Sequence, residues 1–185
     1  GGPPMIDPPL GEDFRRGYLA GMIRGDGMIF HRTYDDGRRV RTVHRFRLAL
    51  ADTEALDRTR TLLAAEGIAT NTRPFGEATS TRQEITAIHT AKGGDIRRLE
   101  RLASEPPLRS KDWHAGYLSG IFDAEGSCSR GILRISNKDA DVLRMLREAL
   151  TAFDFPYVQE PPRENGVSTI RLRGGLPVRQ RFFSV

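Results

Sequence analysis

Two short stretches of the chain repeat one another in register. The first reads GYLAGMIRGDG over residues 17–27, and the second reads GYLSGIFDAEG over residues 116–126. Small residues recur every four positions in each copy, a spacing that places them on one stripe of a helix. Glycine inside a helix costs about 1 kcal/mol relative to alanine, so the stripe indicates that two helix backbones approach closely. The glycines predicted at this helix interface are Gly17, Gly21, Gly116 and Gly120.

Each copy ends in an acidic residue followed by glycine, Asp26-Gly27 in the first and Glu125-Gly126 in the second. If the helices cross on their glycine stripes, the two acids meet at the C-terminal ends. A helix C-terminus carries partial negative charge, so carboxylates there are unfavourable unless something positive lies nearby. A shared Mg²⁺ ion, which prefers oxygen ligands, would meet this need. Asp26 and Glu125 are therefore candidate metal ligands.

The segments LAGMIRGDG (residues 19–27) and LSGIFDAEG (residues 118–126) resemble the LAGLIDADG motif of homing endonucleases, in the form carried twice on one chain. The resemblance covers nearly all of residues 12–185. It implies an α+β fold of two pseudo-symmetric αββαββα halves, with the motif helices paired at the interface and a DNA-binding saddle of antiparallel strands. It also implies site-specific, metal-dependent hydrolysis of both strands of a long asymmetric duplex DNA target, leaving 3′ overhangs.

The same resemblance assigns roles to residues of the motifs. Asp26 and Glu125 would be catalytic and would hold Mg²⁺ or another divalent cation such as Mn²⁺, with Gly25 and Ala124 completing the predicted metal site. Ca²⁺ would support binding without cleavage. At the sixth motif position the second copy has Asp123 where the first has Arg24, a departure that leaves the catalytic position intact.

The remaining sequence predicts the same order of elements in both halves. In the first half we expect a helix over 12–27, strands over 28–34 and 38–50 joined by a turn at 35–37, a helix capped by Thr53, strands over 68–74 and 82–90, and a helix from Gly93. In the second half we expect a helix capped by Ser110, strands over 127–130 and 132–136, a helix over 139–153, strands over 157–160 and 167–173, and a helix opened by residues 174–175. The chain then divides into a flexible leader (1–11), a first half (12–105), a linker (106–111) and a second half (112–185).

One predicted strand, over residues 38–50, is strongly two-faced. Alternate side chains of a strand lie on opposite faces, so its arginines share one face while Phe46 and Leu48 share the other. A merely solvated face would normally include acids, and this one has none. A basic two-stranded ribbon fits the DNA major groove. The predicted DNA-binding residues are Arg39, Arg41, Arg45 and Arg47 in the first half and Arg130, Arg134, Thr169 and Arg171 in the second; which of them contact bases and which contact phosphates stays open.

Two further basic residues, Lys92 and Arg173, each precede a glycine near the end of their half. Residues 91–94 match residues 172–175, and Lys92 resembles the basic residue that homing endonucleases keep near the scissile phosphates. A cation there would stabilise developing charge, and Arg173 could act only in this way because it stays protonated. The alternative is that both residues simply precede a turn. The four histidines and Cys128 show no zinc-site spacing, so we expect no zinc site.

Composition agrees with a nucleic-acid partner. The 185 residues carry a net charge of +5, which suits a polyanion. A single cysteine fits a reducing compartment, and no apolar run is long enough to span a membrane. We expect a monomer with an internal pseudo-two-fold, bound to double-stranded DNA and to no membrane, in the cytoplasm at a bacterial nucleoid, with an organelle left open.

Two other interpretations remain open at this stage. A cleavage-deficient DNA- or RNA-binding protein of the same fold, such as a transcription regulator or intron maturase, is disfavoured because both acids are retained. Residues 174–183 resemble the end of an intein endonuclease region, but the chain lacks the terminal Cys or Ser nucleophile and the His-Asn pair that splicing needs. The chain could therefore be the endonuclease domain of an intein without being able to splice.

Overall fold

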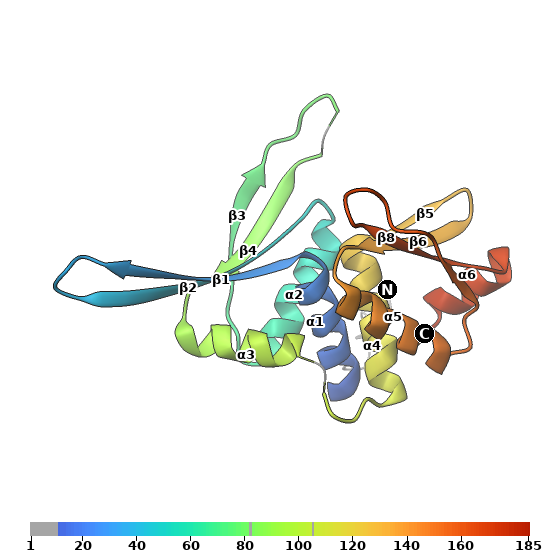
Figure 1. Ribbon diagram of the computed structural model, residues 1–185, viewed down its shortest axis with the longest axis horizontal. Helices are drawn as coiled ribbons and strands as arrows, with labels where there is room; N and C mark the ends of the chain where they lie inside the picture. The colour runs from blue at the N-terminus through green and yellow to red at the C-terminus, as the bar shows by residue number, and fades with distance from the viewer. Residues whose placement is uncertain (1–10, 82, 105) are drawn as a thin grey trace, which may run out of the picture.

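The computed structural model describes residues 11–81, 83–104 and 106–185, and its architecture is two αββαββα halves on either side of a central pair of helices (Figure 1). The first half contains α1 (Glu12–Asp26), β1 (Gly27–Asp35), β2 (Val40–Leu50), α2 (Thr53–Ala65), β3 (Asn71–Gly76), β4 (Ile85–Thr90) and α3 (Gly93–Ala103). The second half contains α4 (Lys111–Glu125), β5 (Gly126–Ser129), β6 (Ile132–Asn137), α5 (Ala140–Ala152), β7 (Tyr157–Gln159), β8 (Ser168–Leu172) and α6 (Gly175–Phe183). The predicted fold class is confirmed.

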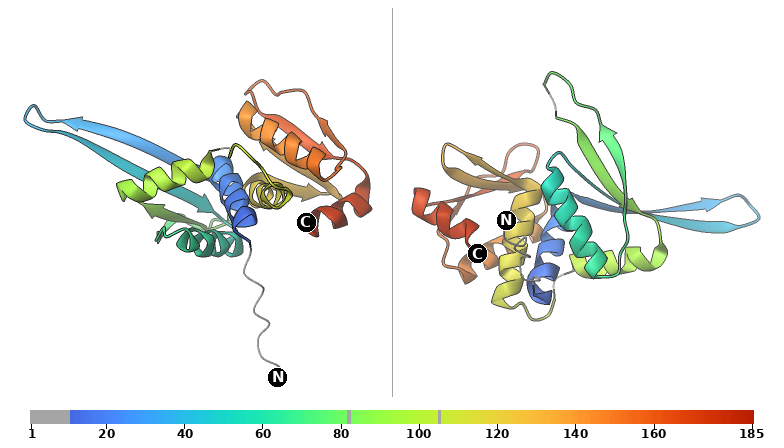
Figure 2. Two further views of the ribbon diagram at one scale, coloured as in Figure 1. Left: turned by 90° about the horizontal axis from the view of Figure 1, so that it is seen from below. Right: turned by 180° about the vertical axis from the view of Figure 1, so that it is seen from behind.

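Each half carries one four-stranded antiparallel sheet, in the order β1-β2-β4-β3 in the first and β5-β6-β8-β7 in the second. The hairpin of β1 and β2 projects far from the body, whereas that of β5 and β6 is short (Figures 1 and 2). The halves therefore share a plan but differ in reach.

The central helices α1 and α4 touch backbone to backbone along their glycine stripes. A Cβ atom on Gly17 would lie 2.0 Å from the backbone oxygen of Trp113, and one on Gly120 would lie 2.1 Å from that of Tyr18. A Cβ on Gly116 would lie 2.0 Å from the backbone oxygen of Phe14, and one on Gly21 would lie 2.6 Å from the backbone nitrogen of Ile121. Real Cβ atoms essentially never come so close, so any larger residue would force the helices apart.

Each half has its own hydrophobic core, and the motif helices contribute to both. Tyr18, Leu19 and Met22 of α1 are buried with the first half, while Tyr117 and Ile121 of α4 are buried with the second. The apolar face predicted for β2 is buried only from Phe46 onward. The far part of the hairpin extends beyond the core, where Val40 is 66% exposed.

Several predicted boundaries were wrong by a few residues, for local reasons. The N-cap of α2 is Asp52, whose side chain accepts hydrogen bonds from two backbone N–H groups, rather than Thr53. Strand β2 begins at Val40 because Asp36 accepts hydrogen bonds from the N–H groups of Arg38 and Arg39 and lengthens the turn. By contrast, Ser110 caps α4 as expected.

The strand predicted over 68–74 also starts later, at Asn71. Gly67 adopts a positive φ, and Ile68 then folds back to donate its N–H to the carbonyl of Leu63 and is fully buried. Ile68 therefore completes the end of α2, as glycine-terminated helices commonly do. The neighbouring strand begins at Ile85, and the predicted start at Arg82 lies outside the described residues.

The predicted leader lies outside the described residues except for Gly11, which precedes α1. Within the described ranges, no helix is both long and apolar enough to cross a membrane.

Candidate active site

The two motif acids are the last residues of the paired helices, Asp26 of α1 and Glu125 of α4. A Cβ atom on Gly25 would lie 2.6 Å from the Cβ of Ala124 and 3.4 Å from the Cγ of Glu125. The helices are therefore still in contact where they end, and the acids lie side by side. Directly after them the chain enters β1 and β5, so the acids sit where the two sheets begin.

Burial disfavours the ionised form of both carboxylates. It raises the pKa of Asp26 to about 6. Burial likewise raises the pKa of Glu125 to about 7, with a smaller contribution from the charge of Asp26 and an opposing one from Asn137, which donates a hydrogen bond of 2.6 Å to Glu125. No neighbouring cation contributes to either shift. The site thus holds two half-buried acids with no compensating positive charge.

This donor set fits a divalent cation of the Mg²⁺ type. Mg²⁺ is commonly bound by one or two carboxylates plus waters and substrate phosphates rather than by a full protein cage. Accordingly, the described part of the chain contains no group of three or more His, Cys, Asp or Glu side chains placed to hold a metal. The residues that would hold a cation are Asp26 and Glu125, with Gly25 and Ala124 immediately before them.

The strand register places one arginine from each half opposite the start of the strand that follows a motif acid. Arg47 pairs with Met28, and Arg134 pairs with Ser127. Both partners lie two residues after a motif acid, so the two arginines occupy equivalent places in the two halves. Sequence reasoning assigned both to DNA binding but did not detect this equivalence, because it depends on the pairing of strands.

Lys92 and Arg173 lie further away. Lys92 is two residues past Thr90, which pairs with Phe46, so it is level with His44. Leu48 is the residue of β2 that lies opposite Gly27, directly after the first motif acid. His44 is four positions along β2 from Leu48, or about 13 Å at roughly 3.3 Å per residue. By the same reasoning, Arg173 is level with a residue of β6 three positions, or about 10 Å, from the one opposite Gly126. Both are exposed.

The two residues are also not structural equivalents. Lys92 is the N-cap of α3, and the N-cap of α6 is Gly174. The sheet register agrees. Leu48 and Ile135 are equivalent, because each lies opposite the glycine that follows its motif acid. Their partners on the next strand, Ile88 and Ile170, are therefore also equivalent, which aligns Lys92 with Gly174. The sequence match of residues 91–94 with 172–175 is therefore one residue out of structural register.

The outer face of the first sheet is rich in arginine. Arg41, Arg45 and Arg47 of β2 share this face with Arg32 of β1, which is opposite Val43. Arg73 of β3 joins them, because it is opposite Ala87, itself opposite Ala49 of β2. Arg39 falls in the turn. Sequence analysis missed Arg32 and Arg73, although Arg32 could have been found from the alternation of the strand that contains it.

The corresponding face of the second sheet carries Arg134 and Arg171, which are cross-strand partners. Arg130 lies in the tight turn between β5 and β6 with a positive φ. Thr169 is 3% exposed, and its hydroxyl is hydrogen-bonded to that of Ser136 at 2.7 Å. Thr169 is thus a weaker candidate for direct contact than its arginine neighbours.

The side chains at the sixth motif position differ between the two copies, and both form hydrogen bonds between the halves. Asp123 accepts hydrogen bonds of 2.7 Å from the hydroxyl of Tyr18 and from the guanidinium of Arg58, both in the first half. Arg24 donates to the carbonyl of Ala103 and pairs with Asp141 of the second half at 2.9 Å. The unequal residues at this position thus form complementary cross-half contacts.

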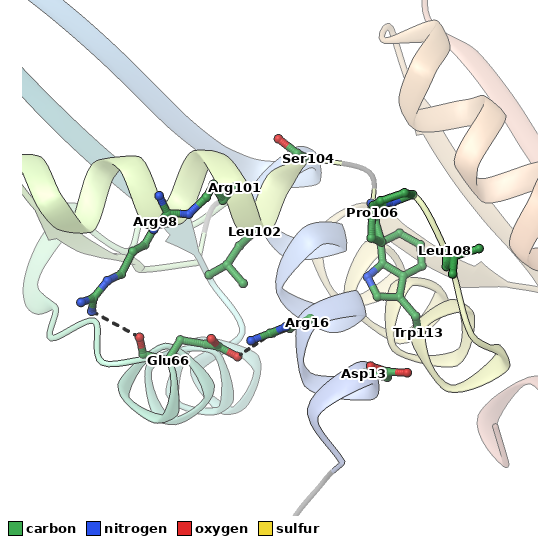
Figure 3. A pocket seen from close by; sticks show the side chains of 11 residues that line it. Asp13, Arg16, Glu66, Arg98, Arg101, Leu102, Ser104, Pro106, Leu108 and Trp113 are labelled. Atoms are coloured by element: carbon green, nitrogen blue, oxygen red, sulfur yellow. Dashed lines mark hydrogen bonds and ion pairs between the residues drawn. The ribbon is translucent and has the colours of Figure 1, made fainter.

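A pocket lies away from the acids. It has a volume of about 680 Å³ and is lined by residues from the N-terminal parts of the motif helices, including Asp13 and Trp113, and by α3. Figure 3 shows Arg16 and Arg98 on either side of Glu66. Arg16 pairs with the Glu66 carboxylate and Arg98 donates to its backbone oxygen, and these contacts form part of the pocket wall. Because the motif acids occupy the opposite ends of the helices, this pocket is separate from the candidate active site.

Comparisons with known proteins agree with this architecture. The family model of the LAGLIDADG-like domain matches residues 112–178. No curated protein sequence matches the chain. Among solved structures, I-DmoI in complex with DNA and Mn is similar with a TM-score of 0.72 at 16% identity, covering 93% of this chain and 95% of that one. Mesophilic variants of the homing endonuclease I-DmoI match equally well, with a TM-score of 0.72, 16% identity, and 93% and 94% coverage.

A second kind of protein shares the fold. The N-terminal LAGLIDADG domain of DUF199/WhiA has a TM-score of 0.70 at 16% identity, over 96% of this chain and 83% of that one. Other I-DmoI structures contain DNA and Ca, or target DNA in the presence of Mg. The chain therefore has the fold of these two-motif LAGLIDADG structures, and its residues 112–178 match the model of the LAGLIDADG-like domain.

Proposed function

We propose that this chain, on the premise of its LAGLIDADG-like second half and two-motif LAGLIDADG fold, is a homing endonuclease that hydrolyses both strands of a long asymmetric duplex DNA target. It acts as a monomer in the cytoplasm, depends on a divalent cation, and leaves 3′ overhangs. Residues 12–105 and 112–185 form its two functional halves. The I-DmoI complexes with DNA support the choice of partner.

One observation carries this proposal: Asp26 and Glu125 end paired helices side by side, half-buried, with raised pKa values and no compensating cation. Keeping two such carboxylates together is unfavourable unless an ion or substrate completes the site. A purely structural pair of helix ends would gain nothing from these carboxylates, whereas cleavage chemistry would use them to bind an ion.

The roles of the chain's own residues follow from their places. Asp26 and Glu125 would hold Mg²⁺ or Mn²⁺, and the bound cation would supply activation of water and stabilisation of charge on the phosphate and leaving oxygen. Arg47 and Arg134, at equivalent positions of the two sheets, would bind the phosphates of the two strands by bidentate hydrogen bonds. The longer first hairpin, with its arginine-rich face, would extend contact over one half-site, which suits an asymmetric target.

The alternative is a DNA-binding protein of the same fold that does not cleave. The similarity to DUF199/WhiA favours keeping it, because that chain matches almost as well as I-DmoI. The two proposals agree on DNA binding and differ only in whether the acids perform chemistry.

Cleavage of a selected target separates the two. A cleavable site is first selected from a randomised duplex library with Mg²⁺, and a plasmid carrying it is assayed for nicking and linearisation. Asp26→Asn and Glu125→Gln should each reduce cleavage at least about 100-fold while sparing binding, since one transition-state interaction is commonly worth that much. The exposed Asp57→Asn serves as a matched control and should cleave normally. Full cleavage by the Asp26→Asn/Glu125→Gln variant would overturn the nuclease assignment, and binding without any cleavage would favour the alternative.

A further inference from the structure

Two histidines meet on the face of the long hairpin that lies opposite the arginines. His31 of β1 and His44 of β2 are cross-strand partners. Their rings make an edge-to-face contact with centroids 4.7 Å apart, and the Nδ1 atoms of the two rings face each other in hydrogen-bond contact. Neither residue takes part in the proposed cleavage chemistry. The pair marks the point where the hairpin leaves the body, because the next residues on this face, Ile29 and Phe46, pack in the first core.

A carboxylate from a third element selects the tautomer of His31. Glu100 of α3 lies 2.8 Å from the Nε2 atom of His31. A carboxylate only accepts hydrogen bonds, so Nε2 of His31 carries the proton and, in the neutral ring, Nδ1 carries a lone pair. That lone pair is aimed at Nδ1 of His44. The two nitrogens therefore share one proton here, and a metal ion could take the place of that proton if the rings moved slightly apart.

We propose that His31 and His44 form a binding site for a transition-metal ion such as Zn²⁺, Ni²⁺ or Cu²⁺, with Glu100 orienting His31. Imidazole nitrogens suit these ions. A ligating histidine commonly donates its other N–H to a carboxylate, and Glu100 supplies that partner. When the ion replaces the shared proton, both Nδ1 atoms ligate it and the His44 proton moves to Nε2.

The rest of the coordination shell would come from water. The described residues offer no third His, Cys, Asp or Glu ligand, while His31 and Glu100 are 45% and 44% exposed, so water reaches the site. Two protein ligands make an exchangeable site rather than a closed structural one, which has four. Its chemistry is distinct from that of Asp26 and Glu125, whose oxygen ligands suit Mg²⁺.

The expected consequence is mechanical. The ion would link β1 to β2 and, through Glu100, hold both strands against α3. Most of the hairpin beyond this point is exposed and has no core beneath it. The inference does not depend on the proposed nuclease activity, and any protein with this hairpin would show it.

The test is calorimetric titration of the tag-free full-length chain with ZnCl₂ and NiCl₂, in excess Mg²⁺ to occupy the carboxylates. A Cys128→Ser background removes the exposed thiol. One ion per chain should bind, with affinity reduced at least about tenfold by His31→Gln or His44→Gln and by roughly 10–100-fold by Glu100→Gln. His89→Gln is the matched control, because His89 lies on the opposite face of the same sheet, beside Arg47, and this change should have no effect.

A second measurement checks the mechanical consequence. Zn²⁺ should slow hydrogen exchange of the β1 and β2 amides in the Cys128→Ser chain but not in the same chain carrying His44→Gln. Zinc affinity that survives both histidine substitutions would overturn the site. Binding that leaves hairpin exchange unchanged would overturn the link to α3.

Discussion

The raised pKa values of Asp26 and Glu125 make the stability of the metal-free protein depend on pH. In the unfolded chain these acids ionise at their ordinary pKa values, whereas in the folded chain burial holds their pKa values at about 6 and about 7. The unfolded state therefore loses these protons first, and the free energy of unfolding should fall as pH rises from about 4 to about 7. Because both groups are partly exposed, we expect about 1 kcal/mol from each after allowance for solvent screening.

Urea denaturation in EDTA at a series of pH values measures this effect. The Asp26→Asn/Glu125→Gln variant lacks both titrations, so the difference between wild type and variant isolates them from all other groups. Mg²⁺ added at pH 8 should restore stability to the wild type alone. Parallel pH profiles for the two proteins would show that the carboxylates ionise normally.

Two neighbouring residues of strand β2 separate binding from stability. Arg45 is exposed on the arginine-rich face, so Arg45→Ala should weaken DNA binding while changing the free energy of unfolding by less than about 0.5 kcal/mol. Phe46 is fully buried, and Phe46→Ala should cost about 3 kcal/mol or more by leaving a cavity. Paired filter-binding and thermal-denaturation measurements check both. A destabilising arginine change beside a silent phenylalanine change would mean that the faces are reversed.

The pairing of α1 with α4 can be tested by adding one methyl group. The Cβ of Gly120→Ala would lie 2.1 Å from the backbone oxygen of Tyr18, so the helices must separate and the variant should lose more than about 2 kcal/mol. Gly94→Ala is the matched control in α3, where nothing lies within 4 Å. It should be neutral or gain up to about 1 kcal/mol, because alanine favours helix. Equal effects of the two substitutions on the melting temperature would contradict a close helix contact.

Local patterns in the sequence predicted the elements well and their mutual placement less well. The fold class and the paired acids followed from two repeated motifs, each of which is contiguous in the chain. The equivalence of Arg47 and Arg134 depends on strand register, which no local pattern of these residues reveals. His31 and His44 meet for the same reason, although they show no metal-site spacing in sequence. The helix that begins at Gly93 was predicted, and the role of Lys92, which precedes it, stays a prediction.

The boundary errors have a similar origin. Thr53 and Asp52 are both suitable N-caps, and only the hydrogen bonds of Asp52 decide between them. Ile68 is apolar and lies next to a predicted strand, yet it packs under the end of α2. In each case two local solutions were acceptable, and tertiary packing selected one.

The two sheets together predict how DNA affinity depends on salt. Each phosphate neutralised by a side chain contributes about −0.9 to the slope of log affinity against log salt. With arginines on both sheet faces, we expect a slope of about −5 or steeper for the selected duplex.

Arg41→Ala and Arg171→Ala, one from each half, should each reduce the magnitude of this slope by about 1 if they contact phosphate. Arg101→Ala, beside the pocket away from the motif acids, is the control and should leave the slope unchanged. Fluorescence anisotropy over a range of KCl concentrations gives these slopes. A slope near zero, or one lowered as much by Arg101→Ala as by the sheet variants, would remove the two arginine faces as the DNA-binding surface.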